Sequence, residues 1–162
     1  YKRQVKGEAF EASGFHITPF GVPHDSSDNV GYSIEYEGVV FTLLTDVGHI
    51  TEKMKAIIRN TDYLVIEANY DLQMLQNGPY PRHLQERIQC GTGHLSNAQC
   101  GAALVENYTE RLKHIWLCHL SEENNHPELA RKSIEQALSN AGIKVKLDVL
   151  RRKQPTGVFE LV

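Results

Sequence analysis

The sequence predicts an α/β protein of the layered α+β type, in which helices cover a β-sheet. Two observations carry this prediction. Short apolar runs bounded by turn residues are typical of strands, and they alternate with stretches whose apolar residues recur every three or four positions, which is typical of helices. Such alternation favours layers with the helices outside the sheet. The 162 residues are enough for one domain with its own core.

A hairpin is the first clear element. The runs Val30–Tyr36 and Val39–Thr45 are rich in β-branched and aromatic residues, and Glu37-Gly38 between them is typical of a tight turn. His24 precedes the first strand and Asp46 follows the second, so the hairpin can bring both to one end of the sheet. Imidazole nitrogen and carboxylate oxygen both suit cations such as zinc. Taken alone, a polar loop and a strand-ending aspartate remain the simpler interpretation.

The remaining strands are expected where short apolar runs recur. They are Phe15–Phe20, the buried runs Asp62–Glu67 and His114–Cys118, and the closing runs Lys144–Leu150 and Gly157–Leu161. Three of the predicted strands end in a residue capable of chemistry, namely Asp46, Glu67 or His119. Functional side chains usually collect at strand ends and adjoining loops of a rigid sheet. We therefore expect one site that also includes the loop residues His24 and His94.

Helices are expected between the strands, each with a start signal. Thr51 suits the N-cap of a helix through Arg59. Ser96 and Gln99 form a capping box, so His94 lies on a loop just ahead of a helix. The other signals are Pro81 before Leu84 and Ile88, a shared face of Ala98, Ala102 and Val105 after the capping box, and a helix from near Pro127 to Gly142.

Composition limits the class of protein. The formal net charge of −3 gives no global basic character, so a nucleic-acid substrate would need a local patch or bound metal. A membrane partner is not expected, because the sequence has no apolar run of about 18 residues. Cys90, Cys100 and Cys118 form no CxxC pair, and we expect all three to be buried and reduced in a cytoplasmic protein.

The chain resembles the metallo-β-lactamase superfamily of metal-dependent hydrolases. Five stretches carry the resemblance in order: PFGVPHDSSDNVGY, LLTDVG, VIEANYD, GHLSN and CHLSEENN. The closest likeness is to the bacterial WalJ (YycJ) family, which is related to the tRNase Z and RNase J nucleases. The resemblance implies an αββα sandwich that holds two divalent metal ions at one edge of its paired sheets, with zinc expected and manganese as the alternative.

The resemblance also implies roles for individual residues. His24 matches a ligand of the first metal, Asp46 a ligand that bridges both, and His119 a ligand of the second. Glu67 and His94 match a pair that handles protons beside the metals, although Glu67 could instead cap a loop and His94 could be a helix-end residue without chemistry. The other histidines are assigned to the surface or to packing: His16, His49, His83, His114 and His126.

One motif of the family is missing. No HxHxDH occurs in these 162 residues, and the chain begins at Tyr1 with a strand that normally follows that motif. We therefore expect residues 1–162 to be the C-terminal portion of a single metallo-β-lactamase-like domain, inactive alone because four ligands are absent.

For the intact protein the resemblance implies a phosphodiesterase that uses a hydroxide activated by two metal ions. Nucleic acid is the expected partner, with DNA 5′-to-3′ exonuclease activity favoured over action on RNA. Two alternatives stay open. One is a hydrolase of small esters, thioesters or lactones, and the other is a non-catalytic regulatory or scaffold domain.

Overall fold

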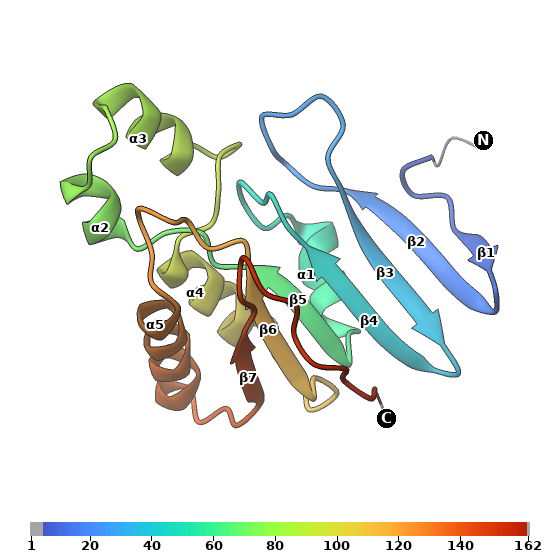
Figure 1. Ribbon diagram of the computed structural model, residues 1–162. Helices are drawn as coiled ribbons and strands as arrows, with labels where there is room; N and C mark the ends of the chain where they lie inside the picture. Colours follow the sequence, from blue (N-terminus) through green and yellow to red (C-terminus); the bar gives the residue numbers. More distant parts are fainter. Residues whose placement is uncertain (1–4, 162) are drawn as a thin grey trace.

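The computed structural model describes residues 5–161, and in that range it contains one seven-stranded sheet and five helices (Figure 1). The strands lie in the sheet in chain order from β1 to β7. The antiparallel half consists of β1 (Phe10–Ala12), β2 (Phe15–Gly21), β3 (Val30–Tyr36) and β4 (Val39–Leu44). The parallel half continues from β4 through β5 (Tyr63–Glu67), β6 (His114–Cys118) and β7 (Lys146–Val149).

Helices supply the crossovers that parallel strands need. They are α1 (Glu52–Arg59) after β4; α2 (Leu72–Asn77), α3 (Arg82–Gln89) and α4 (Asn97–Asn107) after β5; and α5 (Pro127–Asn140) after β6. The predicted start signals are confirmed at Thr51, which caps α1, and at the capping box of Ser96 and Gln99, which opens α4. Within residues 5–161 no helix has the length and apolarity needed to cross a membrane.

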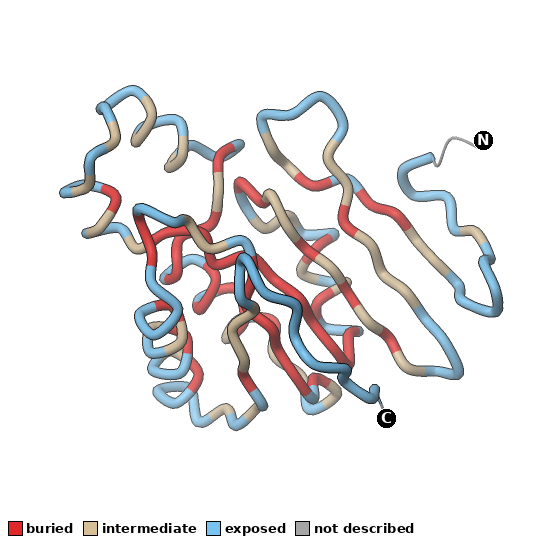
Figure 2. The backbone as a smooth tube through the Cα atoms, viewed as in Figure 1, coloured by how far each residue is buried: buried red, intermediate tan, exposed pale blue. Residues whose placement is uncertain are grey.

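The core lies on both faces of the parallel half of the sheet, because β5 and β6 are buried along their whole length (Figure 2). Alternate side chains of each strand point to opposite faces. Leu64, Ile66 and Ile115 join the larger cluster, to which α1, α4 and α5 also contribute. Tyr63 and Trp116 belong to the smaller cluster on the other face. The rigid centre of the sheet therefore ends at Glu67 and Cys118.

The hairpin has the turn that its sequence predicts. Tyr36 pairs with Val39, and the two residues between them have positive φ, 50° at Glu37 and 80° at Gly38. Two consecutive residues with positive φ define a type I′ turn, whose twist matches that of the flanking strands. This turn fixes the register of β3 and β4.

Three predictions are wrong, two about elements and one about a cysteine. Gly157–Leu161 is not a strand: the segment crosses the smaller cluster, where the Phe159 ring packs edge-on against Trp116 with 5.0 Å between centroids. Packing on that cluster takes the place of pairing with β7. On α4, Ala98 and Ala102 are exposed, and the buried face is formed by Cys100, Ala103, Leu104 and their neighbours. Cys90 is exposed as well, whereas Cys100 and Cys118 are buried as expected.

Two short elements, β1 and α2, lie outside the predicted set, and the strand expected over Lys144–Leu150 is shorter, spanning Lys146–Val149. For α2 a signal exists in the sequence. The Asp71 carboxylate accepts hydrogen bonds from the backbone N–H groups of Gln73 and Met74, which is the geometry of an N-cap.

Candidate active site

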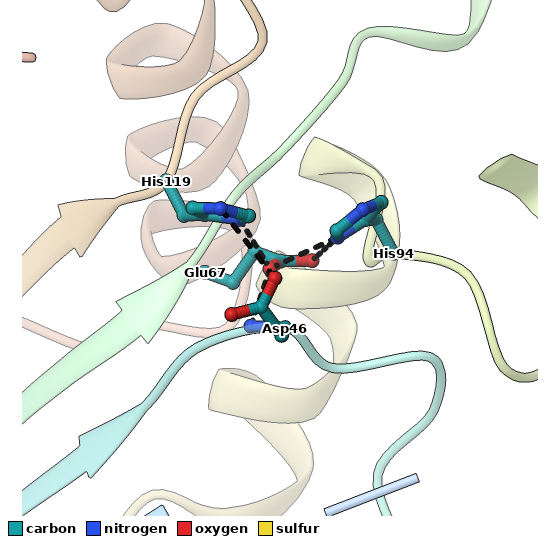
Figure 3. Close-up of side chains that lie close together, drawn as sticks. All are labelled: Asp46, Glu67, His94 and His119. Carbon is teal, nitrogen blue, oxygen red and sulfur yellow. Dashed lines mark hydrogen bonds and ion pairs between the residues drawn. The ribbon is translucent and has the colours of Figure 1, made fainter. Parts of the chain in front are cut away.

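Four side chains meet where three neighbouring parallel strands end (Figure 3). Asp46 follows β4, Glu67 ends β5 and His119 follows β6, while His94 comes from the loop before α4. Because β4, β5 and β6 are adjacent and parallel, their C-terminal ends share one edge of the sheet. The sheet therefore gathers residues that are far apart in the sequence.

Glu67 lies at the centre of this cluster. Its carboxylate accepts hydrogen bonds from the backbone N–H groups of Asp46 (2.8 Å) and Leu95 (2.9 Å). It also accepts hydrogen bonds from Nδ1 of His119 (2.8 Å) and Nδ1 of His94 (3.1 and 3.2 Å to its two oxygens). Glu67 thus fixes both the position of Asp46 and the orientation of two imidazoles.

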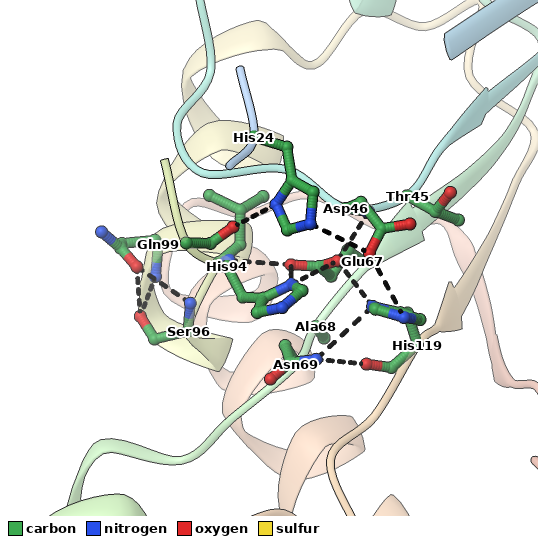
Figure 4. Close-up of polar contacts among 12 residues, drawn as sticks. His24, Thr45, Asp46, Glu67, Ala68, Asn69, His94, Ser96, Gln99 and His119 are labelled. Carbon is green, nitrogen blue, oxygen red and sulfur yellow. Dashed lines mark hydrogen bonds and ion pairs between the residues drawn. The ribbon is translucent and has the colours of Figure 1, made fainter. Parts of the chain in front are cut away.

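Three histidines around the cluster have the same arrangement of ring nitrogens (Figure 4). Nδ1 of His94 and Nδ1 of His119 face Glu67, and Nδ1 of His24 lies 3.0 Å from the carbonyl oxygen of Gly93. Carboxylate and carbonyl oxygens only accept, so each Nδ1 carries the hydrogen. In each neutral ring the lone pair is therefore on Nε2. The His94 ring lies next to both of the others, with centroids 4.9 Å apart for His24 and His94 and 5.3 Å apart for His94 and His119.

Asp46 lies between two of these lone pairs. Its Oδ1 is 3.6 Å from Nε2 of His24 and 3.5 Å from Nε2 of His119. These distances are longer than a hydrogen bond, so the atoms face one another without a direct contact. The Asp46 side chain is 34% exposed, so it is partly accessible to solvent.

The donor set fits a divalent metal ion. One potential ligand atom each from Asp46, Glu67, His94 and His119 lies within 4.8 Å of the others. Imidazole nitrogen with carboxylate oxygen suits zinc and similar cations. A metal-ligating histidine usually donates its second N–H to a carboxylate or carbonyl, as His24 and His119 do here.

Backbone strain is stored at two of these positions. Asp46 and His119 both have φ of 55°, the left-handed region that residues other than glycine seldom adopt. Each is held there by neighbours: the Asn29 amide donates to the Asp46 carbonyl (2.8 Å), and the Asn69 amide donates to the His119 carbonyl (2.8 Å). The strained turns direct both side chains toward Glu67 and its partners.

A buried asparagine network supports the loops on the His119 side. The Asn125 amide donates to the carbonyls of Ala68 (2.9 Å) and Asn69 (3.1 Å), and Asn97 and Asn125 exchange side-chain hydrogen bonds. On the Asp46 side, Gly48 lies so close to Gly91 that an added Cβ would be 2.4 Å from the Gly91 carbonyl oxygen. These contacts hold the loops that carry Asp46, His94 and His119 against one another.

The electrostatics keep Glu67 ionised. Burial raises the pKa of its carboxyl group, but the hydrogen bonds from His119, His94 and the Leu95 backbone outweigh burial, so the pKa lies below its usual value. The pKa of His119 is raised, mainly by the hydrogen bond to Glu67 and against the effects of burial and of the Arg152 charge. An ionised Glu67 can accept hydrogen bonds from both imidazoles but has no proton to give.

The cluster opens into a groove of about 1530 Å³. One wall comes from α3 and the loop around His94, and the other from the segment after β7. His24, His94 and His119 all line it. An extended substrate can therefore reach the strand ends.

The structure brings together all five residues that the sequence singles out: His24, Asp46, Glu67, His94 and His119. Their metal-binding and catalytic roles stay predictions. His114 and His126 have packing or capping contacts, as expected: His114 pairs with Asp148, and His126 caps α5. The supporting residues Asn69, Asn97 and Asn125 were missed by sequence reasoning. Their signal was an asparagine shortly after the functional residue in EANYD, GHLSN and CHLSEENN.

Among curated proteins, the chain is similar to two that are named exodeoxyribonucleases. The chain is 34% identical over 139 residues to "Exodeoxyribonuclease YycJ" of Bacillus anthracis, covering 86% of this chain and 53% of that protein. It is 39% identical over 132 residues to "Exodeoxyribonuclease WalJ" of Streptococcus pneumoniae strain D39, covering 82% and 49%. The chain thus spans about half the length of the curated relatives it matches.

Solved structures show the same fold. The metallo-β-lactamase fold protein YhfI of Bacillus subtilis superposes with a TM-score of 0.66 at 16% identity, covering 91% of this chain and 52% of that one. Zinc-bound PqqB of Methylobacterium extorquens gives a TM-score of 0.60 at 24% identity, with 91% and 53% covered. Residues 2–115 match the family described as "Beta-lactamase superfamily domain". The chain therefore belongs to the beta-lactamase superfamily, with the metallo-β-lactamase fold.

Proposed function

We propose that the intact protein is a metal-dependent phosphodiesterase that degrades nucleic acid, with DNA exonuclease activity as its main reaction. The observation that carries the proposal is the strand-end cluster, in which Nε2 of His24 and Nε2 of His119 face the Asp46 carboxylate. The similarity to two proteins named exodeoxyribonucleases supports the substrate class.

His24, Asp46 and His119 would hold divalent metal ions, zinc or manganese, together with ligands from outside residues 1–162. When bound, such ions supply Lewis-acid stabilisation of a phosphoryl group and lower the pKa of a coordinated water. Asp46 would be shared between two ions, because its carboxylate faces a histidine on either side. We expect residues 1–162 alone to be inactive, since three ligands cannot complete two coordination spheres.

Glu67 would act as a positioning residue. It is fully buried, and its two oxygens already accept hydrogen bonds from four donors. By accepting from Nδ1 of His119 it keeps the Nε2 lone pair of that ring free for a metal. Its lowered pKa argues against a role as a proton donor.

His94 would transfer the proton. Its side chain is 20% exposed and lines the groove, so it can approach a substrate. Because Nδ1–H points to Glu67, Nε2 is the nitrogen able to donate a proton to the leaving oxygen. The Glu67 carboxylate compensates the positive charge of the protonated ring.

The groove supports a large substrate. Its volume of about 1530 Å³ exceeds the range of roughly 300–1,000 Å³ common for small-molecule pockets. A narrow mouth would instead have favoured a small ester or lactone.

The proposal is tested on the intact protein with metal added back after chelation. DNA and RNA of one sequence, labelled at either end, should be compared with a lactone and a thioester, for wild type and Asp46→Ala. We expect metal-dependent release of nucleotides from DNA that is lost in Asp46→Ala. Turnover of the lactone or thioester without DNA cleavage, or DNA cleavage that survives in Asp46→Ala, would overturn the proposal.

A further inference from the structure

The groove is locally positive although the chain is not. Five cationic residues and three carboxylates line it, whereas the whole chain has a formal net charge of −3. The cationic residues are Arg87, Arg131, Arg151, Arg152 and Lys153. Three of these are consecutive and lie in the segment after β7, which forms the wall beside His119.

The basic segment, Arg151–Lys153, is anchored to the loop that follows His119. The Glu122 carboxylate forms ion pairs with Arg152 and with Lys153. It lies 2.8 Å from Nη1 of Arg152 and 2.9 Å from Nζ of Lys153. Nη2 of Arg152 also donates to the carbonyl of Leu120. Leu120 directly follows His119. These contacts therefore hold the Arg152 and Lys153 side chains close to His119.

The positive charge of the basic segment exceeds the negative charge of Glu122, its partner. Glu122 offers one negative charge to two cations, and Arg151 contacts the neutral amide oxygen of Gln154 at 2.7 Å. The opposite wall differs, since Arg87 there is paired one-to-one with Asp25. A phosphate that enters the groove therefore meets uncompensated positive charge on the side of the basic segment.

We propose that Arg152 and Lys153 bind phosphates of the nucleic-acid strand whose end lies in the site, with Arg151 adding to the attraction. The inference rests on the proposed function and assigns the strand-binding wall of that same site. Lys153 is 75% and Arg152 38% exposed in their side chains, so both can contact a ligand while Glu122 holds them in place. Arginine and lysine contacts of this kind are independent of base sequence.

The test is salt-dependent binding of a labelled single-stranded DNA to the intact protein in EDTA, followed by fluorescence anisotropy. R152A/K153A should bind more weakly, and the slope of log K against log salt should be shallower by about 1.4, at roughly 0.7 per phosphate contact with a single strand. R152Q/K153Q, which keeps polar side chains of similar length, should behave alike. The matched control K132A/K144A also removes two exposed lysines, but ones outside the groove lining, and should keep the wild-type slope.

Hydrolysis of bis(p-nitrophenyl) phosphate by wild type, and its loss in Asp46→Ala, tests the active site without a bound strand. If this Asp46-dependent hydrolysis is observed while R152A/K153A and R152Q/K153Q keep the wild-type salt slope, the inference fails and the proposed function stands. An equal change in the slope of K132A/K144A would also overturn it, because the effect would then be one of overall charge. If wild type neither binds DNA nor hydrolyses the small phosphodiester, both proposals fail.

Discussion

Strand β6 has a histidine at each end, and each pairs with a carboxylate at the same distance. His114 begins the strand, and its Nε2 is 2.8 Å from Asp148. His119 follows the strand, and its Nδ1 is 2.8 Å from Glu67. The two pairs are chemically alike, yet their surroundings suit different tasks.

The His114 pair is part of the packing. His114 is 5% exposed, its ring stacks on Trp116 with centroids 3.8 Å apart, and Phe159 approaches the ring edge-on. Its surroundings lower the pKa of His114, mainly through burial, with Lys146 adding to the effect and Asp148 opposing it. A histidine held in this way favours its neutral form and stabilises the sheet.

The His119 pair faces the groove. Its side chain is 42% exposed, its φ is strained, and its Nε2 is directed toward Asp46 at 3.5 Å. A histidine–carboxylate contact therefore does not by itself indicate a functional site. His119 differs from His114 in its second nitrogen. Its Nδ1 is fixed by Glu67, while its Nε2 faces the Asp46 carboxylate, another potential metal ligand.

Removing Asp46 should have the largest effect. Asp46→Ala in the intact protein should lose metal as well as activity, because the carboxylate lies between the His24 and His119 nitrogens. On the proposed function it would compensate the repulsion of two cations. Asp148→Asn, at the other end of the sheet, should keep both. It should cost at most about 1 kcal/mol of stability, since the Asp148 side chain is more than a third exposed. Metal analysis and single-turnover cleavage on the same preparations measure this.

Removing His94 should have the second-largest effect. His94→Ala should keep its metal but lose about 10²–10⁴-fold in cleavage rate, the usual contribution of a positioned acid or base. A substrate with an activated leaving group needs little protonation, so the defect should shrink with it. If His94→Ala loses metal, or is equally impaired on both substrates, His94 is not the general acid.

Glu67→Gln should have an intermediate effect. An amide offers one acceptor oxygen where the carboxylate now serves four donors, so the His94 and His119 rings lose part of their orientation. We expect metal affinity to fall about 10- to 100-fold, as is usual for a residue that orients a ligand. Isothermal titration of the metal-free variant measures this, with thermal melts to confirm folding. Wild-type affinity would show that the hydrogen bonds to Glu67 do not matter for the ligands.

The smallest effect concerns His114 and pH. Because its pKa is lowered in the folded protein, the unfolded chain binds more protons between the folded pKa and the unfolded value of about 6.5. The stability that neutral His114 contributes is therefore present above about pH 6.5 and is lost as the pH falls toward the folded pKa. Denaturant unfolding of the metal-free protein from pH 8 to 5 should show a shallower loss for His114→Gln. An unchanged pH profile would mean that another group causes the loss.

Much of the site could be predicted because its parts are encoded locally. The ends of β4, β5 and β6 are visible as the last residues of apolar runs, and parallel strands bring such ends together. The tautomers of His24 and His119 could not be predicted, because they depend on acceptors 69 and 52 residues away in the sequence. The asparagine network likewise appears only once the loops are in place.

The failures of the sequence-based predictions have physical reasons. Gly157–Leu161 has a strand-like pattern, but Phe159 finds an aromatic surface on Trp116 that no sequence window reveals. On α4 the spacing of the alanines predicts one apolar face, whereas the larger Leu104 and Cys100 are the residues buried in the core. Cys90 follows the short helix α3 at the surface, where burial cannot be judged from residue type.

A metal centre at the strand ends is tested most directly by observing the histidine nitrogens while metal is added. Long-range ¹H–¹⁵N correlation spectra of the intact protein, with ¹⁵N-labelled histidine, distinguish Nδ1 from Nε2 in each ring. On addition of zinc, the Nε2 signals of His24 and His119 should shift, their Nδ1–H should be retained, and His114 should be unaffected. Unchanged His24 and His119 signals at saturating zinc, or a shift of His114 in their place, would contradict a metal centre at the strand ends.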